Sequence, residues 1–485
     1  MERFKIASLL IILLLGFFVR LYRFDNPIAD WHAWRQADTS AVSRNFAENG
    51  FDVLHPRFDD LSNVASGIDN PDGFRFVEFP IYNFLQAASF KTIGILTLEE
   101  WGRLITIFAS LLSSVFIYLI IKKRFGFTAG FFSAFFFLFL PYSIYFSRVI
   151  LPDPSMVMAS LGGIYFFELW LEKKLKIKNK KLKITPGIFF ILSLLFTSIS
   201  FLLKPYALFF TLPMIYLAYE KFGFDLFKKW QLWVFAALSI IPLFLWRLWM
   251  LNFPQGIPVS DWLFNGNGIR FRPSFFYWIF YERLAKLILG FWGIVIFVLA
   301  VFKIKKLKDL LFVSFFGLSS IIYVTVLATG NVQHDYYQIL IIPSASIFLG
   351  LGASFLIERK NTFKKYIYTG ILIACIILGF SYSWNLVKDY FNINNRSIIL
   401  AGKAVDRLVS KDAKVLANYN GDTSFLYHTK RKGWASFQKG LDEMVGLGAS
   451  YLILVNPTPA DMELSNTYKV VEKTNQYVIF DLVRK

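Results

Sequence analysis

The sequence is poor in cysteine, histidine and charge. It holds one cysteine and four scattered histidines in 485 residues, so it offers no disulfide within one chain and no zinc-type ligand spacing. Charged residues make up 18%, whereas 56% of the residues are apolar and form long uncharged runs. No glycine-rich nucleotide loop is visible. This composition excludes a disordered chain, a coiled coil and a collagen-like fibre, and it argues against an ordinary soluble enzyme.

The apolar runs have lengths that suit membrane helices. A bilayer core of about 30 Å needs roughly 20 helical residues, and shorter runs qualify when flanking charges snorkel to the interface. The candidates are residues 6–19, 104–121, 125–147, 154–167, 184–203, 205–219, 230–246, 287–302, 310–333, 336–357 and 366–387. A further run, 79–90, is short and could cross, re-enter or lie along the surface. We predict a polytopic α-helical membrane protein with about 11–13 transmembrane helices.

The excess of basic residues orients the chain. Lys and Arg number 52 against 33 Asp and Glu, a net charge of +19 that in a soluble protein would suggest nucleic acid. Much of the excess instead falls in five short loops between runs, at residues 122–124, 173–183, 221–229, 303–308 and 359–365. The positive-inside rule places these loops in the cytoplasm. We therefore expect the lipid bilayer as a partner and no nucleic acid.

The first long loop has the opposite charge. Residues 25–90 contain ten Asp or Glu against four Arg and no Lys, so we place them outside and the N-terminus inside. This arrangement requires that residues 79–90 do not cross the membrane. If they crossed, the N-terminus would be outside and residues 25–78 inside. In the favoured arrangement the outer face carries residues 25–100, 148–154, 252–282, 331–337 and 388–485.

The C-terminal tail differs in character from the rest of the chain. Charges are mixed there, and short apolar strands are expected at residues 415–417, 451–455 and 477–482. Helical patterns cover residues 400–409 and 433–448, and the second leads directly into a strand. We predict a membrane domain over residues 1–387, with surface-lying helices in its loop 25–100, and a small extracytoplasmic α/β domain over residues 388–485.

Three cations stand at the outer ends of predicted helices, where the positive-inside rule disfavours them. Arg148 follows run 125–147, Lys204 ends run 184–203 and precedes Pro205, and Arg247 lies near the outer end of the helix that starts at residue 230. Simple snorkelling explains each one separately. Together they indicate an anionic ligand at the outer leaflet, and phosphate is the obvious one.

Two carboxylates on the same face are candidates for catalysis. Apolar residues at helical spacing around Asp38 predict a surface-lying amphipathic helix. Asp153 lies between Pro152 and Pro154 in a tight connection between two membrane helices, where it could simply cap the second. A carboxylate beside a cationic phosphate site can accept a proton from an attacking hydroxyl while the cations stabilise the leaving phosphate.

Other candidate ligands stand near the same face. His334, Tyr336 and Tyr337 follow one another between two predicted spans. Two tyrosines at an interface are commonly an aromatic belt, but with the histidine beside them they could bind a phosphate or a sugar. Glu78 meets the membrane just before a turn at Pro80. A divalent metal ion bound by carboxylates and His334 stays open, because spacing alone cannot show it.

At these residues the chain resembles the polytopic GT-C glycosyltransferases. It is most similar to bacterial glycosyltransferase family 39, which includes protein O-mannosyltransferases, and its layout is similar to that of the lipid A aminoarabinose transferases. The resemblance covers nearly all of residues 1–387. It is carried by these motifs in this order: Trp34-Arg-Gln-Ala-Asp38-Thr, Glu78-Phe-Pro80, Arg148-Val-Ile-Leu-Pro-Asp153-Pro, Leu203-Lys204-Pro205 and His334-Asp-Tyr-Tyr337.

The resemblance implies a GT-C fold and an inverting sugar transfer on the non-cytoplasmic side. The donor would be a sugar on a polyprenyl phosphate, and the acceptor a hydroxyl of a glycan, lipid or protein. Asp38 matches the catalytic acid of the first loop, and Asp153 matches the second acidic motif. The family often has a second acid after the first, where this chain has Thr39. The aminoarabinose enzymes place a lysine after the acid matching Glu78, where this chain has Phe79.

Arg148, Lys204 and Arg247 are therefore the expected phosphate contacts, with Glu78, His334, Tyr336 and Tyr337 as further substrate contacts. No nucleotide or redox cofactor is expected, because a sugar phosphate already has a good leaving group. We expect an integral protein of the bacterial inner membrane whose active site faces the periplasm or exterior. A transporter or lipid flippase is the main alternative, but it predicts polar residues at mid-membrane depth and inverted repeats. A non-catalytic scaffold gives no reason for the pairing of Asp38 and Asp153.

Overall fold

The computed structural model describes residues 2–172, 186–358 and 361–484. The predicted basic loop 173–183 and residues 359–360 of the loop 359–365 lie outside the described residues. By their contacts the residues form two compact units. The helical unit consists of Met1–Tyr22, Leu104–Trp246 and Ser260–Asp389. The loop–sheet unit consists of Arg23–Arg103, Arg247–Val259 and Tyr390–Lys485. The predicted tail and the predicted first loop thus belong to one unit, and the division at residue 388 stays a prediction.

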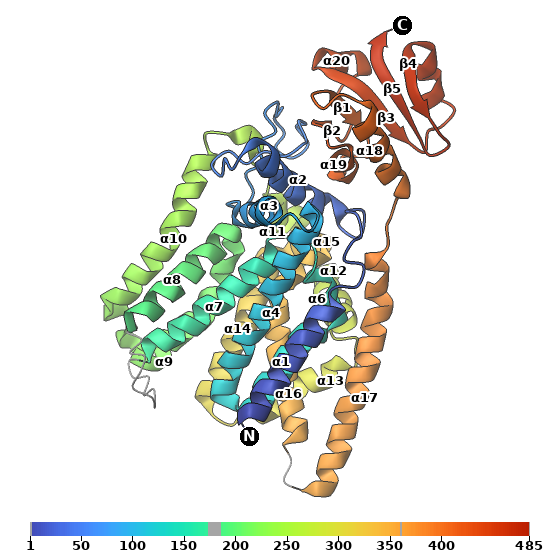
Figure 1. The fold of residues 1–485 in the computed structure, drawn as a ribbon. Coiled ribbons are helices and arrows are strands. Elements are labelled where there is room, and N and C mark those ends of the chain that lie inside the picture. The colour runs from blue at the N-terminus through green and yellow to red at the C-terminus, as the bar shows by residue number, and fades with distance from the viewer. Residues whose placement is uncertain (1, 173–185, 359–360, 485) are drawn as a thin grey trace. The chain divides into compact units, whose positions relative to one another are not determined.

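The helical unit consists of long helices that pack along one another (Figure 1). Helix α7 packs along α8, α5 along α16, and α9 along α14. Its α-helices are α1 Glu2–Val19, α4 Leu98–Phe125, α5 Phe127–Phe139, α6 Pro141–Phe146, α7 Asp153–Leu171, α8 Pro186–Leu203, α9 Leu212–Phe222, α10 Trp230–Met250, α11 Trp262–Asn265, α12 Pro273–Phe276, α13 Gly293–Leu299, α14 Leu307–Val326, α15 Ala328–Gln333, α16 Ile342–Ile357 and α17 Thr362–Val387. Helices α4 and α10 begin or end within the loop–sheet unit.

Short turns of other helix types complete this unit. They are the 3₁₀ turns η1 Pro205–Thr211, η2 Gly223–Lys228, η4 Gly266–Phe271, η6 Ala300–Lys303 and η7 Asp335–Ile341, and the π-helix η5 Tyr277–Ile288. Such turns occur where an α-helix is interrupted. Five of the predicted apolar runs are helical but interrupted: 125–147, 205–219, 287–302, 310–333 and 336–357.

Six described stretches are long and apolar enough to cross a membrane: Leu98–Phe125, Asp153–Leu171, Trp230–Met250, Leu307–Val326, Asp335–Ile357 and Thr362–Leu408. Pro273–Ile288 and Gly293–Lys303 pass together as a pair bent by 107°. Two shorter apolar helices, Phe127–Phe139 and Gly187–Leu203, coincide with predicted runs. The polytopic helical fold is confirmed, whereas the total of 11–13 crossings stays a prediction.

The breaks have local causes. Run 125–147 divides at Leu140, which has φ −55° and ψ 125° because the following Pro141 disfavours helical geometry. The 107° bend lies at Gly290, whose φ of +56° suits glycine. A Cβ at Gly290 would stand 2.0 Å from the carbonyl oxygen of Gly379 on α17. The bent pair therefore packs closely on α17 only because residue 290 has no side chain.

The loop–sheet unit contains the helices of the first loop and the C-terminal sheet. Its elements are α2 Ala33–Asn49, α3 Ile81–Ile93, η3 Pro254–Gly256, η8 Lys388–Phe391, α18 Arg396–Leu408, α19 Thr423–Thr429, α20 Leu441–Gly446 and η9 Asp461–Asn466. Helix α3 has 13 residues, about 20 Å at 1.5 Å per residue, and alone it is too short to cross a bilayer core. This length favours the arrangement in which residues 79–90 do not cross.

The sheet has five strands in the order β2-β1-β3-β5-β4. Strand β1 Lys414–Ala417 pairs in parallel with β2 Gly433–Trp434 and β3 Ala449–Val455, while β5 Tyr477–Arg484 pairs antiparallel with β3 and β4 Tyr468–Lys473. Helices α18 and α19 cover one face with Ala404, Val405 and Phe425 in their core. The predicted small α/β fold is confirmed. The helix expected over residues 433–448 is wrong at its start, because Gly433 and Trp434 pair with β1 and only α20 is helical.

Candidate active site

The helical unit holds a buried ion pair between two residues predicted from the sequence. The Lys204 ammonium lies 3.2 Å from the Asp153 carboxylate, with side chains 7% and 3% exposed. The Lys204 ammonium also lies 5.8 Å from the ring centres of Tyr206 and Tyr337. The other oxygen of Asp153 is buried and has no hydrogen-bond partner among the described residues. The pair can thus accept a further polar group.

The local sequence explains how this pair forms. Asp153 is in the first turn of α7, where the helix dipole stabilises a negative charge. Lys204 follows α8 and precedes Pro205, which forces the preceding residue into an extended conformation. The observed φ of −157° and ψ of 126° at Lys204 agree with this rule. The cation therefore leaves the axis of α8 at the position where α7 begins.

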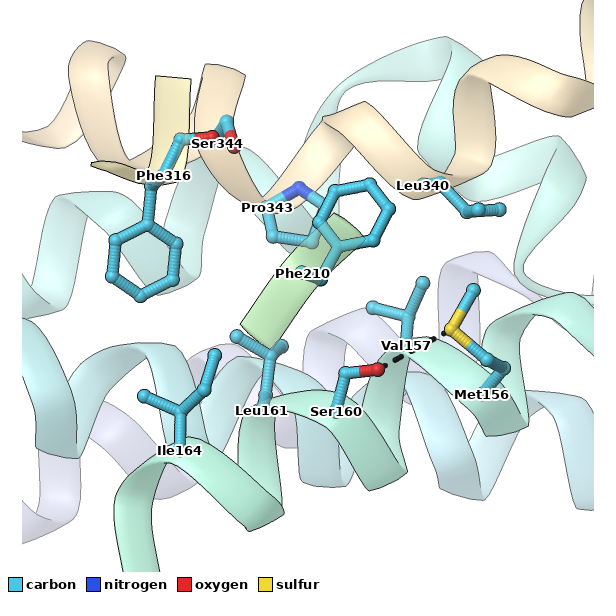
Figure 2. Close-up of a pocket in the computed structure, with 10 residues that line it drawn as sticks. All are labelled: Met156, Val157, Ser160, Leu161, Ile164, Phe210, Phe316, Leu340, Pro343 and Ser344. Carbon is cyan, nitrogen blue, oxygen red and sulfur yellow. Dashed lines mark hydrogen bonds between the residues drawn. The ribbon is translucent and has the colours of Figure 1, made fainter. Parts of the chain in front are cut away.

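The first turns of α7 are fixed by tight packing. Met156, Val157 and Ser160 line a small pocket with Phe210 of η1 and Pro343 of α16, and Figure 2 shows these side chains converging. The pocket holds only about 20 Å³, roughly one water molecule. It has no room for a substrate, so we assign it to packing that fixes the turn carrying Asp153.

The other predicted residues of the helical unit lie near one another or in the core. The His334 ring contacts Trp262, Tyr336 and Tyr337 at centroid distances of 5.8, 5.7 and 6.3 Å. Tyr336 and Tyr337 are buried, and the Tyr323 hydroxyl donates to the Tyr337 carbonyl. The aromatic group thus approaches Lys204 through Tyr337, whose ring centroid lies 5.8 Å from the Lys204 ammonium.

Arg148 is fully buried. Its Nη1 donates to the carbonyl of Tyr22 at 2.6 Å, and this contact connects the start of the α6–α7 connection to the end of the first helix. Sequence reasoning missed Arg283, whose Nη1 lies 3.8 Å from the carboxylate of Asp335. Arg283 belongs to the π-helix η5, and no sequence signal separated it from the ordinary charges of the chain.

The same unit contains an apolar groove. Its walls come from α7, α8, η1, α9, η2 and α10, and it measures about 330 Å³. Phe201 of α8 and Leu208 of η1, which precede and follow Lys204 in the sequence, line it together with Phe227 of η2. Such a groove suits a hydrocarbon chain.

The loop–sheet unit holds Asp38, on α2. Its Oδ2 lies 2.6 Å from Nη2 of Arg75, and its Oδ1 accepts a hydrogen bond of 2.7 Å from the hydroxyl of Thr423 on α19. The Asp38 side chain is 4% exposed. Glu78 pairs with Arg35 in the same unit. Arg247, in the last turn of α10, is exposed.

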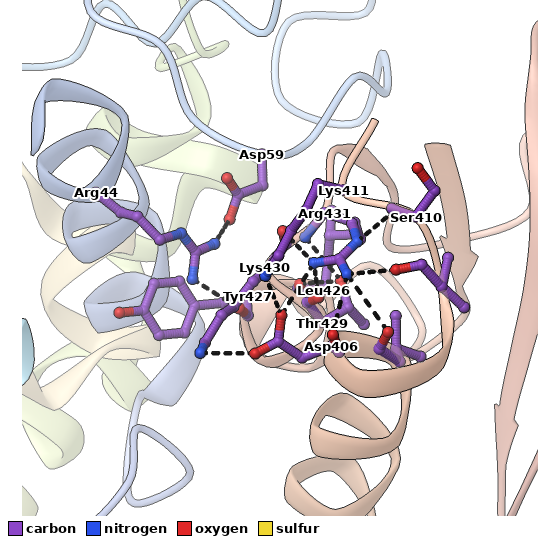
Figure 3. Close-up of polar contacts among 12 residues, drawn as sticks. Arg44, Asp59, Asp406, Ser410, Lys411, Leu426, Tyr427, Thr429, Lys430 and Arg431 are labelled. Carbon is purple, nitrogen blue, oxygen red and sulfur yellow. Dashed lines mark hydrogen bonds and ion pairs between the residues drawn. The ribbon is translucent and has the colours of Figure 1, made fainter. Parts of the chain in front are cut away.

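Buried charges attach α19 to α2. Figure 3 shows Arg44 of α2 paired with Asp59 and donating to the carbonyl of Tyr427 on α19. The Tyr427 hydroxyl in turn donates to Glu99 at 2.5 Å. Burial raises the pKa of the Asp59 carboxyl, and the Arg44 guanidinium partly offsets this rise. These contacts fix the helix that supplies Thr423.

A second cluster stabilises the other end of α19. Arg431 is buried and donates to the carbonyls of Val409 and Ser410, at 2.6 and 2.8 Å, and to Asp406 (Figure 3). Lys430 and Lys411 also pair with Asp406. Burial alone would raise the pKa of Asp406, but hydrogen bonds from the three cations hold it well below its ordinary value.

No metal centre is visible among the described residues, which contain no cluster of three His, Cys, Asp or Glu side chains placed to hold an ion. The helical unit is that of a polytopic helical protein, and it contains a buried cation–carboxylate pair and an apolar groove. Residues 77–249 match the sequence family described as dolichyl-phosphate-mannose-protein mannosyltransferase. No curated protein matches the sequence.

Solved structures share this fold. ArnT from Cupriavidus metallidurans bound to undecaprenyl phosphate matches with a TM-score of 0.64 and 12% identity, over 98% of this chain and 97% of that chain. The Archaeoglobus fulgidus oligosaccharyltransferase AglB, in complex with an inhibitory peptide and a dolichol-phosphate, matches with a TM-score of 0.58 and 12% identity, over 95% and 70%. These matches show that the chain has the GT-C fold, as the sequence resemblance predicted.

Proposed function

We propose that this protein transfers a sugar from a polyprenyl-phosphate donor to an acceptor hydroxyl, with inversion, on the non-cytoplasmic side of a bacterial inner membrane. The observation that carries the proposal is the buried Lys204–Asp153 pair, which is followed in the sequence by Leu208 and Thr211 of the apolar groove in the same unit. A polyprenyl phosphate has an anionic head and a hydrocarbon tail, and this arrangement offers a cation for the first and an apolar surface for the second.

Lys204 is the proposed phosphate contact. Its ammonium has three donors, and Asp153 at 3.2 Å occupies one and fixes its direction. The tail would lie in the groove that Leu208 and Thr211 begin to line directly after Lys204. We expect Arg148, Arg247, Glu78, His334, Tyr336 and Tyr337 to contribute to the substrate sites.

Asp38 is the proposed general base. The acceptor hydroxyl would attack the anomeric carbon, its proton would pass to the Asp38 carboxylate, and the bond between that carbon and the phosphate oxygen would break. The polyprenyl phosphate leaves with the bonding electrons, and Lys204 stabilises its charge. Arg75, whose Nη2 lies 2.6 Å from Oδ2 of Asp38, holds this carboxylate in a fixed direction. Asp153 is proposed to assist by orienting Lys204.

The polyprenyl-phosphate requirement is tested by binding undecaprenyl phosphate to the purified protein. Lys204→Gln combined with Asp153→Asn, which leaves no unpaired buried charge, should weaken binding about 10- to 100-fold, because a charge-assisted hydrogen bond contributes about 1.5–3 kcal/mol. Lys228→Ala is the matched control, since the Lys228 side chain is 80% exposed. Unchanged affinity in the double variant would remove Lys204 from the phosphate site.

A further inference from the structure

A second pocket lies in the loop–sheet unit, and none of the steps proposed above uses it. It measures about 150 Å³ and is formed by three segments, at residues 29–34, 394–398 and 419–424. The first segment leads into α2, the second into α18 and the third into α19. The volume suits one six-membered ring and is too small for a folded peptide segment or a lipid tail.

Aromatic rings form part of the lining, at Trp31, Trp34 and Tyr419. Trp31 is 40% exposed, and its ring stacks on Tyr390 at a centroid distance of 5.0 Å and an angle of 12°. Between the two tryptophans His32 has a φ of +53°, so the chain turns in the left-handed region just before α2.

Hydrogen-bonding side chains also line the pocket. Asp422 Oδ1 accepts from the Ser424 amide at 2.8 Å, and Asn395 Oδ1 accepts from the Ser397 amide at 2.9 Å. Each of these side chains thereby caps a helix with one atom. For the second atom, Oδ2 of Asp422 and Nδ2 of Asn395, no partner is found among the described residues. The pocket therefore offers both an acceptor and a donor on rigid supports.

We propose that this pocket binds one uncharged pyranose ring of a glycan acceptor. The C–H face of such a ring packs on an aromatic side chain, and its hydroxyls both donate and accept hydrogen bonds. Neither lysine nor arginine lines the pocket, which disfavours a phosphate, and the polar groups disfavour a lipid tail. The identification of the ring as an acceptor rests on the proposed function, whereas sugar binding itself does not.

The pocket wall is directly linked to the proposed base. Thr423 lies between the two lining residues Asp422 and Ser424, and its hydroxyl lies within hydrogen-bond distance of the carbonyl of Trp34, at 3.2 Å, and of Asp38 Oδ1, at 2.7 Å. A ring held in the pocket is thus one residue away from the carboxylate. This proximity is the reason for assigning the pocket to the acceptor.

Saturation-transfer NMR on the full chain in lipid nanodiscs tests the proposal without turnover. The probes are the methyl glycosides of glucose, mannose and N-acetylglucosamine. At least one should receive saturation, with a signal that falls at least fivefold in Trp31→Ala and persists in Trp31→Phe, which keeps an aromatic face. Phe437→Ala is the control for an exposed aromatic residue of the same unit outside the pocket.

Two results would overturn the proposal. If no probe gives a signal that depends on Trp31, the pocket does not bind a pyranose ring. If an added polyprenyl-phosphate sugar displaces the glycoside, the pocket belongs to the donor and the acceptor assignment is wrong. Neither result changes the undecaprenyl phosphate experiment on Lys204, so failure of this inference is separable from failure of the proposed function.

Discussion

The buried carboxylates of this protein have different expected roles, because different groups contact them. Asp38 has an arginine and a hydroxyl as direct partners, Asp153 has a lysine, and Asp60 accepts hydrogen bonds from the amide and hydroxyl of Ser62. Burial disfavours the charged form of a carboxyl group unless its neighbours compensate. The buried Asp60 is therefore expected to affect stability.

Asp60 gives a pH-dependent prediction. Burial raises the pKa of its carboxyl from 3.8 to about 6, and its hydrogen bonds from Ser62 only partly offset this rise. The folded state therefore binds this proton more tightly than the unfolded state, and stability is lost as the pH rises from about 4 through about 6. At pH 7.5 the loss is about 3 kcal/mol. Asp60→Asn should remove it, and thermal unfolding in detergent at pH 5 and pH 7.5 measures the effect.

The stabilisation of Asp60→Asn relative to the wild type should be larger at pH 7.5 than at pH 5. Asp69→Asn is the control, because the Asp69 side chain is 54% exposed and its charge remains solvated. A difference between Asp60→Asn and the wild type that does not change with pH would contradict the role assigned to burial.

At the scale of elements, the contact between α2 and α19 connects the C-terminal sheet to the proposed base. Helix α19 packs against α2, and Arg44 and Tyr427 fix the two helices together. Thr423 then brings its hydroxyl to Asp38 Oδ1. The sheet would thus serve catalysis by positioning a carboxylate, in addition to any binding role.

Thr423→Val tests this positioning role. The change removes the hydroxyl but keeps the shape of the side chain, so α19 should remain folded while Asp38 loses one directional contact. We expect kcat for sugar transfer to fall about tenfold, a cost of about 1.4 kcal/mol, with KM for the donor unchanged. Thr423→Ser should restore kcat, because it returns the hydroxyl. A rise in KM alone, or no rescue by serine, would contradict the assignment.

Elements were easier to predict from the sequence than contacts between them. Pro205 is a local signal for the end of a helix and Asp153 for the start of one. The sequence alone therefore predicted the two helix ends that bring Lys204 and Asp153 together. The strands β1, β3 and β5 also followed from short apolar patterns. Thr423 and Arg75 were missed, because the first lies 385 residues from Asp38 and the second 37, and no periodicity connects such distant positions. The short strand β2 was missed because two residues carry no pattern.

For the whole molecule, the distribution of basic residues and the fold both indicate a polytopic membrane protein. The sequence has an excess of basic residues in loops between apolar runs, and the fold is shared with GT-C proteins. The positive-inside rule predicts a membrane orientation with residues 25–90 outside. In this predicted orientation the proposed acceptor pocket and base would face the non-cytoplasmic side.

Cysteine labelling tests the orientation. In a Cys375→Ser background, Val64→Cys should react with a membrane-impermeant maleimide on intact spheroplasts, because Val64 is 57% exposed in the first loop. Leu307→Cys, 70% exposed beside the basic loop 303–308, should react only after lysis. The reverse pattern would invert the predicted topology and place Asp38 in the cytoplasm.

The central claim is that Asp38 is the base of a polyprenyl-phosphate-dependent sugar transfer, and one assay tests it directly. Purified protein is supplied with a polyprenyl-phosphate sugar, and transfer to a cell-envelope acceptor fraction is followed by mass spectrometry. Asp38→Asn keeps the size and most hydrogen bonds of the side chain, so fold and donor binding should persist while turnover falls at least 100-fold, the scale of general base catalysis. Turnover near that of the wild type would show that Asp38 is not the base.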